Sequence, residues 1–175
     1  MLLKVDGIQV KSIPYGESSQ ILILFTRELG KLAVMAKGVK KSPKSSKGLM
    51  QSFSHNHYQI SRKRGMGTLC SVDNIETFHE LTADLDRVGY GYECLQLIQS
   101  VIQDDQAAPI LFDACLITLR QLSRESKEQL PAIMNAFKIK LLEEEGLLPN
   151  GTNVTYTINS LIQRHLNPKP VIYKL

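Results

Sequence analysis

Apolar and polar residues alternate in short segments through the first 80 residues, a pattern typical of β-strands. Alternation or a short apolar run predicts three strands, over residues 2–11, 20–26 and 31–37. Two more strands are predicted where apolar residues recur, around residues 53–60 and 68–72. Five short strands connected by Gly-containing turns favour a small closed barrel.

From Leu81 onward the apolar residues recur at steps of three and four, which predicts amphipathic helices. We expect a first helix over residues 81–102 and further helices over residues 110–122, 130–146 and 157–166. The apolar face of the first helix is expected to contain Leu81, Leu85, Val88, Tyr92, Leu95, Ile98 and Ile102.

The predicted fold class is therefore α+β, with a five-stranded barrel in residues 1–80 followed by an all-helical domain in residues 81–175. These two parts differ in charge. Residues 1–80 contain 12 Lys or Arg against 6 Asp or Glu, residues 81–150 contain 6 against 11, and residues 151–175 contain 3 against none. The basic barrel is thus the candidate for binding a polyanion, and the acidic helices are candidates for scaffold or protein contact.

A basic loop between the third and fourth predicted strands carries five of these 12 cations. Its cations are Lys37, Lys40, Lys41, Lys44 and Lys47, and a second cluster, Arg62, Lys63 and Arg64, lies at the next turn. Such groups match a phosphate backbone and would give salt-sensitive, sequence-independent binding. In a small barrel the two loops can flank one face, where an exposed Tyr15 can stack on bases. The alternative is a solvated Lys-rich loop that aids solubility.

The sequence predicts no enzyme, no metal and no cofactor. His55 and His57 lie on one side of a strand, but no nearby Cys, Asp or Glu completes a metal site. The three Cys are far apart in the sequence, and no phosphate-binding Gly-rich loop of the Gly-Lys-Ser type occurs. The longest apolar run near the start, over residues 21–25, is far shorter than the ~18 residues of a membrane-spanning helix. We therefore expect a cytoplasmic protein without a secretory signal.

Several motifs, in their order along the chain, resemble the RecO family of bacterial recombination mediators. The motifs are Tyr15-Gly16-Glu17-Ser18-Ser19, Phe25-Thr26-Arg27-Glu28-Leu29-Gly30-Lys31, Ala36-Lys37-Gly38-Val39-Lys40-Lys41, Gly65-Met66-Gly67-Thr68-Leu69 and the segment 141–149. The resemblance implies an N-terminal OB-fold and a helical domain. It also implies binding of single- and double-stranded DNA, annealing of complementary strands, and help in loading recombinase onto DNA coated with single-strand-binding protein.

The resemblance further implies two protein partners, a RecR-like protein and the acidic, apolar tail of single-strand-binding protein. It extends DNA contact to Arg27 and Lys31, which fall on the matching motifs with Lys37, Lys40 and Lys41. Arg120 and Arg124, four residues apart on the second predicted helix, are candidates for contact with the acidic tail. The expected location is the bacterial cytoplasm, in association with the nucleoid. The alternatives are an OB-fold RNA-binding or ribosome-associated protein and a protein-interaction adaptor.

One feature departs from the resemblance. Many relatives insert a zinc module with two Cys pairs just after the helix that ends near residues 147–149. Here the short polar segment 150–153 takes that place, and no Cys follows Cys115. We therefore expect a shortened form without the zinc module, and any partner contact that depends on that module is in question.

Overall fold

The computed structural model describes residues 1–38, 52–147 and 153–166. Its N-terminal part is a closed barrel with the strand order β1-β2-β3-β5-β4. The strands are β1 (Leu2–Tyr15), β2 (Ser19–Thr26), β3 (Gly30–Ala36), β4 (His55–Ser61) and β5 (Gly67–Glu76). Neighbouring strands are antiparallel except β3 and β5, which run parallel. This arrangement confirms the predicted five-stranded OB-fold barrel.

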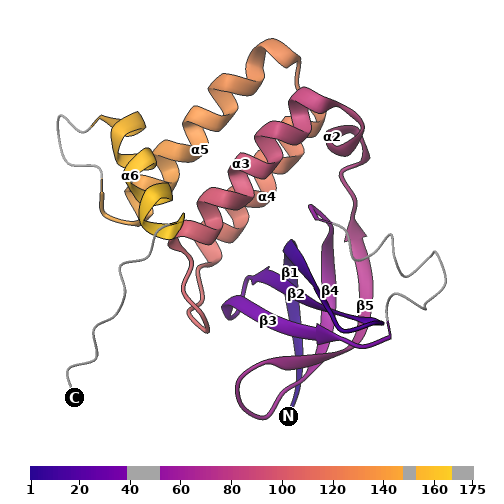
Figure 1. Ribbon diagram of the computed structural model, residues 1–175. Helices are drawn as coiled ribbons and strands as arrows, with labels where there is room; N and C mark the ends of the chain where they lie inside the picture. The colour runs from indigo at the N-terminus through magenta and orange to yellow at the C-terminus, as the bar shows by residue number, and fades with distance from the viewer. Residues whose placement is uncertain (39–51, 148–152, 167–175) are drawn as a thin grey trace, which may run out of the picture.

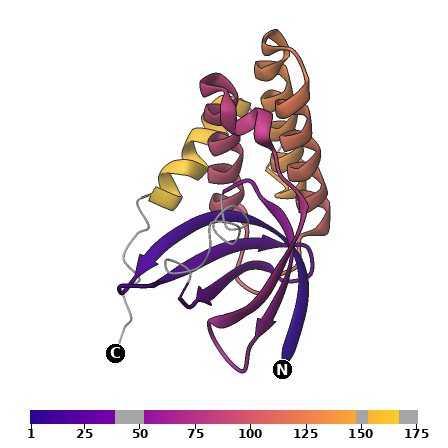
Figure 2. The same ribbon diagram turned by 90° about the vertical axis from the view of Figure 1, so that its right-hand side faces the viewer.

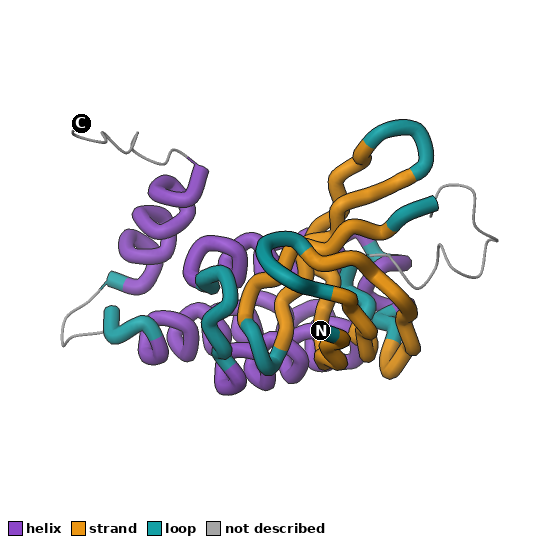
Figure 3. Tube along the Cα trace, turned by 90° about the horizontal axis from the view of Figure 1, so that it is seen from below, coloured by secondary structure: helices purple, strands orange, loops and turns teal. Residues whose placement is uncertain are grey.

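Helices follow the barrel, as predicted, and lie above it in Figures 1 and 2. They are α2 (His79–Ala83), α3 (Leu85–Val101), α4 (Pro109–Arg124), α5 (Leu130–Glu144) and α6 (Val154–Leu166), with a short 3₁₀ helix, η2, at Lys127–Gln129. The helix α3 packs against α4 and α6, and α6 lies at the left of the molecule in Figures 1 and 3. Among the described residues, no helix has the length and apolar character that crossing a membrane requires.

The predicted first helix is in fact two helices, because Asp84 interrupts it. Asp84 has an extended backbone, and its carboxylate accepts hydrogen bonds from the backbone N–H groups of Asp86 and Arg87, so it caps a new helix. Leu85 and Tyr92, which were expected on the apolar face of one continuous helix, are not buried. Leu85 is 86% exposed in the first turn after the cap, and Tyr92 is 54% exposed.

Two apolar clusters stabilise the fold, and one of them joins its two parts. The first fills the barrel and contains Val5, Leu22, Leu24, Leu32, Val34, Tyr58 and Ile60. The second lies among the helices but also includes Ile8, Val10, Phe25 and Phe53 from the barrel side. Helices therefore cover the outside of β1 and β2 around Ile8, Val10 and Phe25. The barrel and the helices share one core.

Phe112 of α4 lies at the centre of this shared core. Its ring is fully buried and meets the Phe25 ring edge to face, with centroids 5.3 Å apart. The His55 ring contacts it from β4 at 5.9 Å. Because aromatic pairs of this geometry add to the energy of apolar burial, Phe112 is the main anchor of the helices on the barrel.

Candidate nucleic-acid interface

The outer surface of β1, β2 and β3 is apolar at its centre. The strand register places Lys11, Ile23 and Ala33 in one cross-strand row, and Ile13, Ile21, Met35 and Thr68 in the next. Residues paired in register have side chains on the same side of a sheet. None of the residues in these rows is buried, and Ile13 is 39% exposed. We call the group Ile13, Ile21, Ile23, Ala33 and Met35 the outer sheet face.

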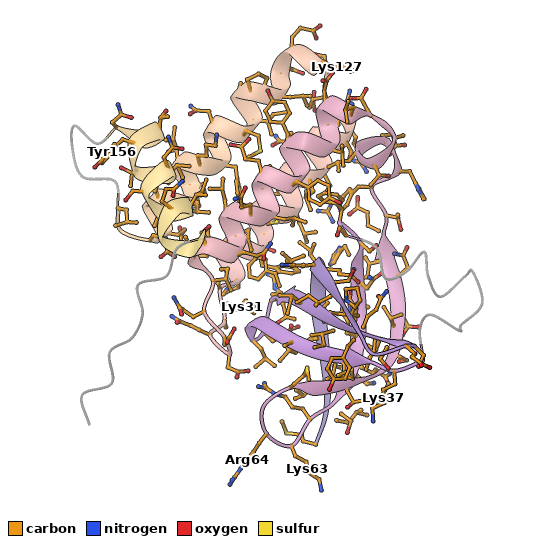
Figure 4. All side chains as sticks on the ribbon, in the orientation of Figure 1. Lys31, Lys37, Lys63, Arg64, Lys127 and Tyr156 are labelled. Carbon is orange, nitrogen blue, oxygen red and sulfur yellow. The ribbon has the colours of Figure 1, made fainter. Side chains whose placement is uncertain are left out.

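Cations and an aromatic ring surround the outer sheet face. Lys11 lies on β1, and Lys37 directly follows the end of β3; both side chains are exposed. Tyr15, at the tip of the β1–β2 hairpin, is 56% exposed, in agreement with the sequence prediction. Lys31 lies at the start of β3, next to the segment that joins α3 and α4 (Figure 4). The face thus combines apolar contact area with positive charge at both ends of β3.

The β4–β5 turn supplies the second predicted cluster of cations. Gly67, at the start of β5, pairs with Val34, so the turn lies alongside the first half of β3. Lys63 and Arg64 are exposed and extend away from the barrel at the end opposite the helices (Figure 4). The structure thus places the turn and Lys37 next to different parts of the same strand, β3.

Three of the predicted DNA-contact cations instead form ion pairs with carboxylates from the helical part. Arg27 pairs with Asp113 of α4 through both terminal guanidinium nitrogens, Lys31 Nζ lies 3.3 Å from Asp104 Oδ1, and Arg62 pairs with Asp105. The hydrogen bond to Asp113 and the charge of that carboxylate raise the pKa of Arg27. The hydrogen bond from Arg62 lowers the pKa of Asp105. These cations therefore connect the barrel to the helices.

The remaining predicted residues fall into two groups. Lys40, Lys41, Lys44 and Lys47 lie outside the described residues. Arg120 and Arg124 both face Glu76, the last residue of β5: Arg120 Nε donates to Glu76 Oε2 at 2.8 Å, and Arg124 Nη2 lies 3.7 Å from Oε1. The side chain of Arg124 is still 73% exposed, so this arginine remains accessible to an acidic partner.

The two histidines have different surroundings although they lie on the same side of β4. His55 is buried beneath α4, where its Nε2 hydrogen-bonds with the carboxylate of Asp6. His57 is exposed. Within the described ranges, no group of three or more His, Cys, Asp or Glu side chains is arranged to hold a metal ion. The His55–Asp6 pair thus links β4 to β1, while the His55 ring contacts Phe112 of α4.

A groove with a volume of about 420 Å³ lies between α4 and α5 on the helical part. Its lining is mostly apolar and includes Ile110, Ala114, Ile117, Ile133 and Phe137, with Lys140 among the polar residues. Ile110 and Ile117 are each 53% exposed. Exposed apolar grooves between helices are a common form of peptide-binding site.

Sequence reasoning missed the outer sheet face, although a signal for it was present. The run Ile21-Leu22-Ile23-Leu24-Phe25 is apolar at every position, whereas a strand with one solvated face alternates. Only Leu22 and Leu24 point into the barrel, so the odd positions had to be apolar for another reason. Phe25 is covered by α4, but Ile21 and Ile23 are not buried.

Comparisons with known proteins agree with this architecture. Residues 1–78 match the family model "Recombination protein O N terminal", and residues 82–168 match "Recombination protein O C terminal". The curated DNA repair protein RecO of Alkaliphilus metalliredigens is 31% identical over 153 residues, which cover 87% of this chain and 62% of that protein. RecO of Macrococcus caseolyticus is 32% identical over 160 residues, or 91% of this chain and 62% of the relative.

RecO of Halalkalibacterium halodurans is 29% identical over 149 residues, which cover 85% of this chain and 58% of that protein. The chain thus spans about three fifths of the length of the curated relatives it matches. The two family matches follow one another along the chain as the barrel and the helices do, and together they show that this chain belongs to the RecO family.

Proposed function

We propose that this protein is a non-enzymatic mediator of recombinational DNA repair that binds DNA and anneals complementary strands. Residues 1–80 would form the DNA-binding domain, and residues 81–175 the helical domain that contacts other proteins. The observation that carries the proposal is the outer sheet face with exposed Lys11, Lys37, Lys63 and Arg64 around it. None of these four cations forms an ion pair within the part of the chain that the structure describes. The named relatives are DNA repair proteins, which supports the same conclusion.

The physical basis is a division of tasks between the cations and the apolar face. The cations neutralise phosphates and release counterions, so binding weakens steeply as salt rises. Bases of a single strand rest against Ile21, Ile23 and Met35 or stack on Tyr15, contacts that need no particular sequence. When phosphates of two strands are neutralised on one protein, their mutual repulsion falls and base pairing completes the annealing.

The apolar groove between α4 and α5 is suited to binding a protein partner in recombinational DNA repair. We propose that it receives the apolar end of the acidic tail of single-strand-binding protein, while Lys140 of its lining faces the carboxylates of the tail. This contact would bring the protein to coated DNA in the bacterial cytoplasm, near the nucleoid, where recombinase is loaded. A RecR-like protein is the second proposed partner.

Replacing Lys37, Lys63 and Arg64 by alanine is expected to weaken binding of a fluorescent oligothymidylate about tenfold at low salt. It should also reduce the slope of log K against log salt by about 2, because each phosphate contact to a single strand contributes about 0.7. The matched control removes three helical cations, Arg124, Lys127 and Lys138, and should change the slope much less. Fluorescence anisotropy over a salt series measures both quantities.

The same variants separate the proposed function from its alternatives. Annealing of complementary oligonucleotides should slow in the barrel variant and remain near the original rate in the helical control. Equal loss in both variants would contradict the barrel site. Preference for RNA over single-stranded DNA in competition would favour an RNA-binding protein, and no nucleic-acid binding at low salt would favour an adaptor.

Replacing Ile117 by glutamate is expected to weaken binding of a labelled peptide in which aspartates precede apolar C-terminal residues. The added carboxylate lies in the groove and repels the acidic peptide while removing apolar contact area. Tyr156→Glu on α6 adds the same charge at a side chain that is 75% exposed and lies far from the barrel in Figure 4. A similar effect of both variants in a peptide titration would argue against the groove.

A further inference from the structure

The segment that joins α3 to α4 attaches directly to the barrel. The backbone N–H of Lys31 donates to Gln103 O at 3.1 Å, and the N–H of Asp105 donates to Lys31 O at 3.3 Å. Lys31 and Asp104 thereby form a parallel bridge, as if a short strand were added beside the start of β3. We call residues 103–106, with the sequence Gln-Asp-Asp-Gln, the acidic strap.

Two backbone features fix the position of the acidic strap. A Cβ atom on Gly30 would lie only 2.0 Å from Gln106 O, so the strap passes where a side chain would otherwise be. Asp105 adopts a left-handed backbone conformation with φ of 58°, which is uncommon for residues other than glycine and which Asp and Asn adopt more readily than the rest. Such conformations persist where surrounding contacts hold them, and their occurrence motivates a functional hypothesis.

The acidic strap presents its two carboxylates to cations of the candidate interface. Asp104 lies next to Lys31, and Asp105 accepts hydrogen bonds from both terminal nitrogens of Arg62. A guanidinium or ammonium group recognises carboxylate and phosphate oxygens in the same way. The side chains of Asp104 and Lys31 are 76% and 32% exposed, and an ion pair this accessible contributes little and exchanges readily. The Asp105 side chain is 50% exposed, so phosphate can approach this pair too, although Arg62 is 18% exposed and binds the carboxylate through two nitrogens, which makes it the stronger pair.

We propose that the acidic strap is an internal competitor for nucleic-acid phosphates at Lys31 and Arg62. This inference rests on the proposed function and adds a regulatory element to it. While the strap is in place, only the cations that it does not pair with bind the DNA strand. Contact of phosphates with Lys31 and Arg62 requires release of the strap, so tight DNA binding and release of the α3–α4 connection favour each other.

The test is the double variant Asp104→Asn and Asp105→Asn, which keeps side-chain size and removes the competing charge. We expect it to bind oligothymidylate several-fold more tightly at low salt, with a slope of log K against log salt steeper by about 1.4, as two further phosphate contacts predict. The control is Asp84→Asn with Asp86→Asn, which makes the same change in net charge at the Lys127 pairs of the helical part. Equal affinity and slope in both double variants would overturn the proposal.

A second pair of measurements keeps the result independent of changes in stability. Lys31→Ala with Arg62→Ala should have little effect on binding in the original protein, because the strap occupies both cations. The same two changes made in the Asp104→Asn, Asp105→Asn protein should abolish its gain in affinity. If instead they weaken binding equally in both backgrounds, the strap does not compete. If neither protein binds single-stranded DNA at low salt, the proposed function itself is wrong.

Discussion

Replacing Phe112 by alanine is expected to lower the free energy of unfolding by about 3–5 kcal/mol, the usual cost of removing a fully buried ring. The ring fills the space between Phe25 and His55, so its loss leaves a cavity where the helices meet the barrel. Arg27 would also lose the ring that its guanidinium carbon approaches at 6.0 Å. Urea unfolding followed by circular dichroism measures the change.

The control for Phe112 is Tyr156→Ala, which removes an aromatic ring that is 75% exposed on α6. Its effect on the free energy of unfolding should stay within about 0.5 kcal/mol. A loss at Phe112 as small as this control would show that barrel and helices do not depend on a shared core.

Replacing Gly30 by alanine is expected to cost about 3 kcal/mol or more, from two sources. Gly30 has a φ of 65°, and a residue with a Cβ atom loses roughly 1–2 kcal/mol in that conformation. The new methyl group would also lie 2.0 Å from Gln106 O and 2.9 Å from Gln103 O, both backbone atoms of the acidic strap. Thermal unfolding of the variant measures the sum of both terms.

Gly16→Ala separates these two terms. Gly16 has a similar φ of 58°, but no atom of the described residues beyond its chain neighbours lies within 4 Å of the position of its Cβ atom. It should therefore show the conformational cost alone, about 1–2 kcal/mol. Equal losses at the two glycines would mean that the strap moves away without cost, which would also weaken the case for its fixed position.

The sequence predicted secondary structure best where the spacing of apolar residues depends on one strand or one helix alone. Alternation, one short apolar run and recurring apolar residues predicted the five barrel strands, and steps of three and four predicted helices through the second part. The first strand continues to Tyr15, beyond the predicted end, because it keeps pairing with β2 past a register shift between Gln9 and Lys11. Periodicity did not show the break at Asp84, since the apolar spacing continues across it while the side-chain cap ends one helix and begins another.

The candidate site was predictable in composition but not in its pairings. Lys37, Lys63 and Arg64 are exposed, as charge clustering between strands indicated. Arg27 pairs with Asp113, 86 positions later, and Arg62 with Asp105, 43 positions later. No local pattern reports contacts between residues so far apart in sequence, because they depend on how the helices dock on the barrel. The ion-pair partners of these cations could therefore be identified only from the structure.

The helix α4 has two opposite roles, and their combination has a thermodynamic consequence. Phe112 and Asp113 attach α4 to the barrel, whereas Ile110 and Ile117 line the outward groove. A peptide in the groove and a strand on the barrel would thus be held by one body without a flexible linker. If the peptide and the DNA strand belong to one complex, binding of either ligand raises the effective concentration of the other at its own site. Two modest affinities can then combine into strong retention on DNA that carries its own protein coat.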